Sequence, residues 1–262
     1  MLERRTSPIG PVYYVSPLLQ RVGVPHGFST RCRGFSGGPF ASLNLGNPSD
    51  DPANIRANYD LLMKACGMVD RRICRVRQVH GRNVAQINSA NAANESVAAD
   101  AMVSRDASCA LSIRVADCLP ILLASMGGTC VAAVHAGWRG IIAGVIPAAI
   151  EELRKLAGGE SLVAALGPCI GIDAFEVGGE VLEQFILTFA DCAPIRHSGN
   201  GKGQVDLRQA ARLQLLGAGV SPECMDMTDR CTFRDAEEFY SHRRDHGVTG
   251  RMAAMIAARR ST

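Results

Sequence analysis

The sequence predicts an α/β or α+β fold in which mixed sheets are flanked by helices. The first observation behind this prediction is that short β-like apolar runs alternate with longer segments whose apolar residues recur at helical spacing. The second is that no linker-like or repetitive stretch divides the 262 residues, a length that one large domain can accommodate. We therefore expect a single domain over residues 1–262, in which residues 1–23 form a peripheral N-terminal segment.

The sequence predicts four helices and five strands. A helix is predicted over Asn54–Cys66, because an Asp-Pro pair precedes it and Gly67 ends it. A second helix is predicted over Ile141–Leu156, in which Pro147 either kinks the helix or marks its first turn. The remaining predicted helices are Val181–Ala190 and Leu207–Leu216. The predicted strands, each bounded by Gly, Pro or Asp, are Arg72–Val79, Cys109–Val115, Thr129–Val134, Leu162–Leu166 and Met252–Ala257.

Composition argues against several classes of partner. The formal net charge of +3 is too small to predict binding to nucleic acid or to a membrane surface. No charge-free apolar stretch reaches the length that spans a bilayer. The 10 cysteines are spread from Cys32 to Cys231 with no secretion signal and no C-x-x-C pair, so we expect reduced thiols and a cytoplasmic protein. Composition does not indicate whether the chain binds another protein.

Three residues with metal-binding side chains occur where predicted strands end. His80, Cys118 and His135 each lie within three residues of the end of such a strand. If these strand ends meet, two imidazoles and one thiolate form the donor set of a catalytic zinc site with an open fourth position, and copper accepts the same donors. The spacing leaves two alternatives open: three separate structural residues, or Cys118 as a nucleophile with His135 as its base.

Two further segments could bind an anion. Gly137-Trp138-Arg139-Gly140 leads into a predicted helix, so its backbone N–H groups could receive phosphate, although a simple packing turn has the same composition. Near the other end of the chain, Phe239-Tyr240-Ser241-His242-Arg243-Arg244-Asp245 joins an aromatic pair to two arginines and a carboxylate. That segment predicts either a clamp for a substrate anion or a solvated charged turn.

Several segments, which together extend over most of the chain, carry a family resemblance. The most specific are Gln78-Val79-His80-Gly81, Asp100-Ala101-Met102-Val103, Ala116-Asp117-Cys118-Leu119-Pro120 and His135-Ala136-Gly137-Trp138-Arg139-Gly140. Further matching segments are His26–Arg31, Asn44–Gly46, Gly167–Gly171, Glu176–Gly178, Cys231-Thr232 and Phe239–Asp245. On these residues the chain resembles the YfiH, or laccase-domain, family.

This resemblance implies a fold, a metal site and an activity. The fold would be a layered sandwich of mixed sheets and helices, similar to a bacterial toxin deamidase domain. The family's metal ligands fall on His80, Cys118 and His135. Family members are described as zinc-dependent enzymes that phosphorolyse adenosine, inosine, guanosine or methylthioadenosine and that deaminate adenosine. We therefore expect a zinc-dependent purine nucleoside phosphorylase with adenosine deaminase activity, whose partners are a nucleoside and phosphate.

Individual roles can be assigned as expectations. Cys118 and His135 are expected at the catalytic centre. Asp117 is a candidate proton shuttle only because it adjoins Cys118, since the His-x-Glu motif of zinc deaminases is absent. The residues expected to contact the substrate, with the arginines placed to receive phosphate, are Arg31, Asn44, Arg139 and Arg243.

Two other functions stay open. Earlier descriptions of family members as copper-dependent polyphenol oxidases imply a laccase-like alternative. However, none of the six histidines forms the His-x-His pairs that supply the ligands of a multicopper cluster. A relative linked to peptidoglycan editing implies the other alternative: a hydrolase that uses Cys118 and His135, or a protein that binds a cell-wall precursor without catalysis.

Overall fold

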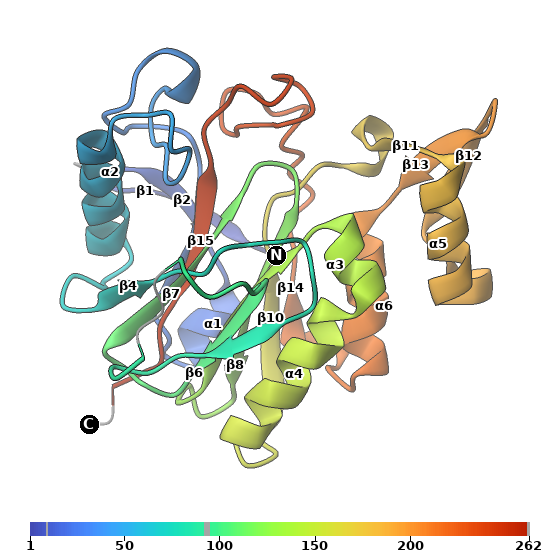
Figure 1. Ribbon diagram of the computed structural model, residues 1–262. Helices are drawn as coiled ribbons and strands as arrows, with labels where there is room; N and C mark the ends of the chain where they lie inside the picture. The colour runs from blue at the N-terminus through green and yellow to red at the C-terminus, as the bar shows by residue number, and fades with distance from the viewer. Residues whose placement is uncertain (9, 92–94, 261–262) are drawn as a thin grey trace.

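Four layers, in the order helix, sheet, sheet, helix, are stacked across the molecule (Figure 1). The computed structural model describes residues 1–8, 10–91 and 95–260. Two six-stranded sheets pack face to face, and their apolar side chains form a shared core between the two middle layers. The structure therefore has the mixed-sheet, helix-flanked architecture that the sequence predicts.

The first sheet has the strand order β1-β2-β3-β15-β7-β4. Its strands are β1 (Glu3–Thr6), β2 (Val12–Val15), β3 (His26–Ser29), β15 (Met252–Ile256), β7 (Cys109–Val115) and β4 (Arg72–Cys74). Helix α2 (Pro52–Ala65) covers the outer face of this sheet, where Leu62 and Met63 share an apolar cluster with Ala253 and Met255 of β15.

The second sheet has the strand order β14-β10-β8-β9-β6-β5. Its strands are β14 (Met225–Asp226), β10 (Leu162–Leu166), β8 (Leu119–Ser125), β9 (Val131–Ala136), β6 (Ala101–Ser104) and β5 (Val84–Gln86). The helices that cover its outer face are α3 (Trp138–Ala143), α4 (Val145–Leu156) and α6 (Leu207–Gly217). The short helix α1 (Pro17–Arg21) packs against β10 and β14.

A small third sheet projects from one side of the molecule together with helix α5 (Gly179–Phe189) (Figure 1). Its strand order is β11-β13-β12, formed by β11 (Glu176–Gly178), β13 (Lys202–Val205) and β12 (Ile195–Gly199). Short 3-10 helices occur at Gly38–Phe40, Ile172–Ala174, Ala190–Cys192 and Pro222–Cys224.

Central strand β8 shows why the middle of the fold is apolar on both faces. All seven of its residues are buried. Leu119, Ile121 and Leu123 belong to the core beneath the helices, whereas Leu122 and Ala124 belong to the core between the sheets. A strand covered on both faces lacks the apolar-polar alternation of a half-exposed strand, so its sequence is a continuous apolar run. The sequence did not predict β8 as a strand, and Pro120 near its start is the local signal against one.

The predicted strands are confirmed to different extents. Cys109–Val115 and Leu162–Leu166 coincide with β7 and β10. The strand predicted over Arg72–Val79 ends at Cys74, so His80 lies on a connection rather than at a strand end. β9 begins and ends two residues later than predicted, which places His135 within the strand. β15 ends one residue before the predicted Ala257.

The predicted helix over Ile141–Leu156 is in fact two helices. Gly144 separates α3 from α4 and has a φ of +83°, a left-handed conformation that glycine adopts without a steric penalty. Pro147 consequently falls in the first turn of α4, which is one of the two positions that the sequence left open. None of the helices in the described part of the chain combines the length and the apolar character that a bilayer span requires.

Residues 1–23 are less peripheral than expected. Only β1 fits that description, since it lies at a sheet edge and its four residues are exposed. β2 is an inner strand, and Leu19 of α1 is fully buried. The carboxylate of Asp226 accepts hydrogen bonds from the Ser16 hydroxyl at 2.6 Å and the Leu18 N–H at 3.0 Å. These buried contacts tie this segment to strand β14.

Candidate active site and metal centre

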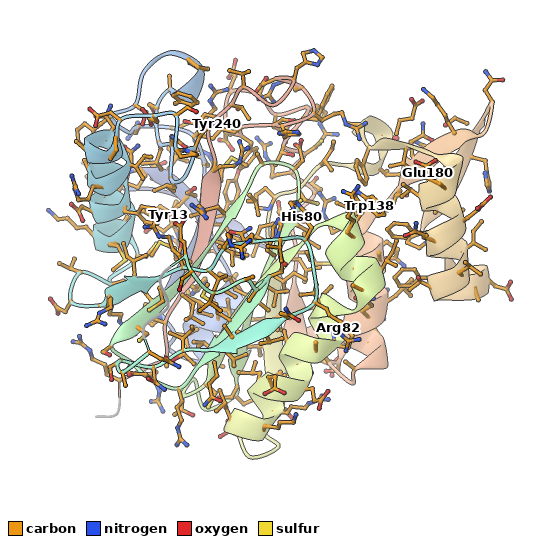
Figure 2. All side chains as sticks on the ribbon, in the orientation of Figure 1. Tyr13, His80, Arg82, Trp138, Glu180 and Tyr240 are labelled. Carbon is orange, nitrogen blue, oxygen red and sulfur yellow. The ribbon has the colours of Figure 1, made fainter. Side chains whose placement is uncertain are left out.

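His80, Cys118 and His135 meet at one place although they lie on three separate parts of the chain. His80 is on the connection from β4 to β5, Cys118 is in the turn from β7 to β8, and His135 is on β9. Both connections pass from the first sheet to the second. The candidate ligand atoms of the three residues all lie within 4.8 Å of one another. Figure 2 shows His80 beside the end of α3 that carries Trp138.

The donor set suits a transition-metal ion. Two imidazole nitrogens and one thiolate are ligands that zinc accepts in catalytic sites, where a fourth position is left for water or substrate. Copper accepts the same donors. The burial of the three residues is graded: His135 is buried, Cys118 is half-buried and His80 is exposed. Solvent exposure within the group therefore increases from His135 to His80.

Asp100, directly before β6, connects the two histidines. The His135 Nδ1 atom lies 2.8 Å from Asp100 Oδ1, and Asp100 is completely buried. With Nδ1–H donating to this carboxylate, Nε2 of His135 is left as the ring nitrogen that can bind a metal. Burial disfavours the charged carboxylate, but hydrogen bonds from His135, Gly81 and His80 hold the pKa of Asp100 below its usual range.

The same carboxylate also fixes the backbone around His80. It accepts hydrogen bonds from the N–H groups of Val79 at 3.2 Å, His80 at 2.9 Å and Gly81 at 2.6 Å. His80 has a φ of +60°, in the left-handed region that a non-glycine residue adopts only when its surroundings impose it. The three N–H groups gathered on Asp100 provide that constraint, so one buried carboxylate orients the His135 ring and fixes the backbone of His80.

Gly137 allows the donor atoms to approach one another. A Cβ atom at this position would lie 2.9 Å from Cys118 Sγ and 3.1 Å from His80 Cδ2. Its backbone conformation, with φ −74°, is open to any residue, so the reason for glycine here is space rather than backbone freedom. The site thus depends on a missing side chain as well as on the three ligands.

Gly137→Ala should weaken metal binding without unfolding the protein. The added methyl group must displace Cys118 or His80, and overpacking of this kind costs about 1–3 kcal/mol. We expect the affinity for Zn²⁺ to fall by about 10-fold or more, measured by competition with a chelating indicator. Gly217→Ala is the matched control, because a Cβ there meets nothing within 4 Å. Equal Zn²⁺ affinity of the two variants would contradict the close approach described here.

The thiol of Cys118 and the imidazole of His135 perturb each other. Burial by itself would raise the pKa of Cys118, but the neighbouring His135 and His80 favour the thiolate and lower it to about 6. Burial would likewise lower the pKa of His135, but Cys118 and Asp100 favour the imidazolium and raise it to about 9. In the protein without metal the two groups therefore form a thiolate–imidazolium pair.

The three candidate ligands line a cleft of about 650 Å³, a volume typical of small-molecule sites. The cleft is strongly cationic. Five arginines line it against two carboxylates, those of Glu95 and Asp117. The five are Arg77, Arg114, Arg139, Arg243 and Arg251. Apolar lining comes chiefly from Trp138, Ile170, Phe175 and Leu207.

Two of the four residues expected to contact substrate line this cleft. The guanidinium of Arg139 lies over the Trp138 ring at 4.3 Å, and that of Arg243 lies over Phe175 at 5.3 Å. Arg31 instead donates to the carbonyls of Ala41 and Ala236. The structure thus places Arg139 and Arg243, but not Arg31, among the residues that line the cleft.

Asn44 also lies outside the cleft lining. It is completely buried, donates to Asp50 at 2.8 Å, and accepts hydrogen bonds from the N–H groups of Gly46, Asn47 and Arg251. It therefore shapes the loop that brings Gly46 and Pro48 to the cleft. Its contacts are those of a loop-organising residue.

Asp117 lines the cleft, but its carboxylate is engaged by the protein. It accepts hydrogen bonds from the Thr232 hydroxyl at 2.6 Å and from the Arg243 N–H at 2.7 Å. Its backbone, with φ +88°, forms the turn that presents Cys118. These contacts join the β7–β8 turn to the segment that carries Arg243. They are the contacts of a residue that positions its neighbours.

Sequence reasoning assigned no role to Asp100, Arg77, Arg114 or Arg251. Asp100 stood in a family-like segment, but its role depends on the distant loop that folds over it. Arg114 and Arg251 are single arginines in or beside β-strands, a placement that gives no signal in one sequence. Only the folded arrangement shows that they share a cleft with the His–Cys–His group.

Fold and site together define a four-layer α+β protein with a candidate single-metal centre in an arginine-rich cleft. A family model described as multi-copper polyphenol oxidoreductase laccase matches residues 25–259, and the chain belongs to this family. A relative from Escherichia coli (strain K12), named purine nucleoside phosphorylase YfiH, is 39% identical over 238 residues, which cover 90% of this chain and 95% of that protein. The resemblance drawn from the motifs is thereby confirmed.

Further relatives agree in sequence and in fold. A protein from Deinococcus radiodurans, named purine nucleoside phosphorylase, is 37% identical over 243 residues, which cover 92% of each chain. The crystal structure of YlmD from Geobacillus stearothermophilus superposes with a TM-score of 0.89 at 30% identity, covering 98% of this chain and 99% of that one. The predicted fold class is thus confirmed by a solved structure as well as by the arrangement of the strands.

Proposed function

We propose that this protein is a zinc-dependent purine nucleoside phosphorylase with adenosine deaminase activity. The observation that carries the proposal is one His–Cys–His donor group that opens into a cationic cleft of about 650 Å³. Relatives that match nine-tenths of the chain bear the name purine nucleoside phosphorylase, which supports the same activity. The substrates would be adenosine, inosine, guanosine or methylthioadenosine, together with phosphate.

The lining of the cleft suits both substrates. Trp138 and Phe175 offer apolar, aromatic surface against which a purine can pack. The excess of five arginines over two carboxylates favours a phosphate dianion, which arginine binds through paired, charge-assisted hydrogen bonds. The volume accommodates a nucleoside and a phosphate at the same time.

Phosphorolysis exchanges one bond for another at the ribose. A phosphate oxygen forms a bond to C1′ while the bond from C1′ to the purine nitrogen breaks. The electron pair of the broken bond goes to the purine, which takes up a proton, and the products are ribose 1-phosphate and the free base. The tasks left to the protein are to align the phosphate with C1′ and to stabilise charge on the departing base.

The residues His80, Cys118 and His135 would hold the zinc ion. When bound there, zinc would supply a Lewis acid that stabilises negative charge at the reacting centre and activates water for deamination. Asp100 would keep His135 in the tautomer that leaves Nε2 for the metal, and it would hold the His80 backbone in place. Arg139 and Arg243, each stacked on an aromatic ring, would bind substrate beside that surface.

A multicopper oxidase reaction has less support. Among the residues described, His80, Cys118 and His135 are the one group of three or more histidines, cysteines or carboxylates that is gathered closely enough to hold a metal. A laccase needs a separate cluster of copper ions besides its electron-accepting site. A single donor group supports chemistry at one metal ion, whether zinc or copper.

Incubating the zinc-loaded protein with adenosine, with and without phosphate, tests this function. Adenine that forms only when phosphate is present indicates phosphorolysis, whereas inosine indicates deamination; chromatography separates the two. We expect both products, and we expect both to disappear after dialysis against EDTA and to return when Zn²⁺ is added. Absence of both products overturns the proposed function, and full activity in EDTA overturns its zinc dependence.

A second candidate function is favoured by one specific arrangement. Cys118, His135 and Asp100 are linked in the order nucleophile, base and orienting carboxylate, which is the logic of cysteine hydrolases. Such an enzyme could act on a muramyl peptide. The arrangement makes no use of His80, however, although His80 lies just as close to Cys118 as a metal site requires.

A further inference from the structure

The two sides of the cleft come from different layers of the fold. Trp138 and Leu207 come from α3 and α6, which lie beyond the second sheet. Arg114 and Arg251, in contrast, come from the first sheet, on β7 and directly before β15. The candidate metal ligands are on the connections and on the strand between these layers. The His–Cys–His group is therefore flanked from different layers, by Trp138 and Leu207 on one side and by Arg114 and Arg251 on the other.

Arg114 and Arg251 are neighbours across two paired strands. In the antiparallel pair of β7 and β15, Arg114 lies opposite Ala253, two residues after Arg251. Because alternate residues of a strand point to the same face, the two arginines share one face of the sheet as a diagonal pair. Diagonal positions are about 7–8 Å apart, a span that a phosphate group can bridge with a hydrogen bond on each side.

Contacts within the protein position both arginines. The Gln78 side chain brackets the backbone of Arg114, donating to its carbonyl and accepting from its N–H, each at 2.8 Å. Gly46 leaves room for the Arg114 side chain, since a Cβ there would lie 2.2 Å from its Cδ atom. Arg251 donates from Nη1 to the carbonyls of Thr249 and Gly250, both at 2.9 Å, which fixes its guanidinium plane.

The charge of this arginine pair is only partly balanced. Glu95 accepts a hydrogen bond from Arg114 at 3.0 Å, but it is 43% exposed and is shared with Arg75 at 3.4 Å. Burial lowers the pKa of Arg251; the carboxylate of Asp117 opposes this shift, and the positive charge of Arg114 adds to it. Two adjacent cations beside a substrate cleft form a site that gains stability from an anion.

We propose that Arg114 and Arg251 form the phosphate subsite of the cleft, on the opposite side of the metal centre from the aromatic surface. This inference rests on the proposed function and assigns its second substrate to particular residues. It differs from the expectation drawn from the sequence, which gave phosphate to Arg31, Arg139 and Arg243. A phosphate held on the first-sheet side and a purine packed on Trp138 would place the C1′ atom between them, beside the His–Cys–His group.

Arg114→Gln and Arg251→Gln test the assignment with the full-length, zinc-loaded protein. We expect each variant to raise the KM for phosphate by about 10–100-fold, the effect of losing a charge-assisted hydrogen bond, with the KM for adenosine changed by less than about 2-fold. Arg251→Lys is a milder variant that keeps the charge, in case loss of the Nη1 contacts disturbs the fold. Arg75→Gln is the matched control, because it removes the other partner of Glu95 from outside the cleft lining.

Direct binding of inorganic phosphate separates this inference from the proposed function. Calorimetric titration without nucleoside should show binding to the protein and to Arg75→Gln, and a loss of about 10-fold or more in Arg114→Gln. That result supports the subsite even if no phosphorolysis occurs. Phosphorolysis with an unchanged phosphate KM in Arg114→Gln and Arg251→Gln overturns the subsite and leaves the function standing. A raised phosphate KM in Arg139→Gln alone also overturns it.

The same titration distinguishes free phosphate from the phosphate of a nucleotide. Inorganic phosphate and adenosine 5′-monophosphate are offered separately to the protein and to Arg114→Gln. Weaker binding of inorganic phosphate to the variant supports a subsite for the free ion, as phosphorolysis requires. If only the nucleotide binds, and its binding depends on Arg114, the assignment to free phosphate is overturned.

Discussion

Replacing His80 with asparagine should abolish metal binding and lower turnover by at least about 1,000-fold, because a metal Lewis acid contributes several kcal/mol of transition-state stabilisation. Asparagine is chosen because it adopts the left-handed backbone of His80, at φ +60°, more readily than most residues. The hydrogen bond from the backbone N–H of this residue to Asp100 would remain. The fold should therefore persist, which circular dichroism and the melting temperature would verify.

This variant separates the two functions that the site permits. The linked set of Cys118, His135 and Asp100 does not include His80, so a cysteine hydrolase would keep most of its activity. A metal-dependent enzyme would lose both the ion and its turnover. His197→Asn is the matched control, since His197 is an exposed residue of β12 outside the cleft. Zinc content by atomic absorption, read beside turnover, decides between the two; zinc retained in His80→Asn would refute the ligand assignment.

Asp100→Asn should lower the affinity for zinc by about 10–100-fold, the usual cost of losing a carboxylate that orients a histidine ligand. The amide keeps the size of the carboxylate but turns one acceptor oxygen into an N–H donor. In Asp100, one carboxylate oxygen accepts hydrogen bonds from His135 and from the His80 N–H, and the other accepts them from the N–H groups of Val79 and Gly81. In either orientation of the asparagine amide, its NH₂ group therefore faces donors instead of acceptors. Both histidines should lose their fixed positions.

The expected signature of Asp100→Asn is a change in metal binding that exceeds the change in stability. Competition with a chelating indicator gives the Zn²⁺ affinity, and the visible spectrum of the Co²⁺-loaded protein reports the geometry of the ligands. Asp106→Asn is the control, because Asp106 likewise accepts backbone N–H groups, those of Ser89 and Ser108, at a turn away from the cleft. An Asp100→Asn protein with unaltered Zn²⁺ affinity and Co²⁺ spectrum would rule out the positioning role.

The sequence identified His80, Cys118 and His135 as candidate ligands because each follows a predicted strand, and the family resemblance implied that they form one site. The sequence could not show how they converge. His80 was expected at the end of a strand, whereas it stands on a long connection whose course is set by hydrogen bonds to Asp100. Contacts between residues this distant in sequence leave no local pattern, so a single sequence reveals the donors without revealing what positions them.

The expected substrate contacts show the same limit. Arg139 and Arg243 line the cleft, but Arg31 donates to loop carbonyls and Asn44 is buried within its own loop. In a single sequence, an arginine that binds a carbonyl of its own chain looks the same as an arginine that binds phosphate. Which of these it does depends on the backbone that surrounds it, and that is decided by tertiary structure.

Elements with a strong local signal were predicted well, and elements that depend on their neighbours were not. Helix α2 was found within two residues at its start, because its capping residue Asp51 and the glycine after its end are both local signals. The short edge and inner strands β1, β2 and β3 were missed, since their pairing with one another stabilises them more than their composition does.

The two connections that carry His80 and Cys118 cross between the sheets, and this placement has a thermodynamic consequence. His80 and Cys118 lie on these connections, whereas His135 belongs to the second sheet. An ion held by all three residues would therefore link both connections to the second sheet. Unfolding separates the three ligands along the chain and releases the ion. By mass action, zinc at 100 times its dissociation constant would then add about 2.7 kcal/mol to the free energy of unfolding. The bound ion would thus stabilise the folded chain, and removing the metal would lower its stability as well as its activity.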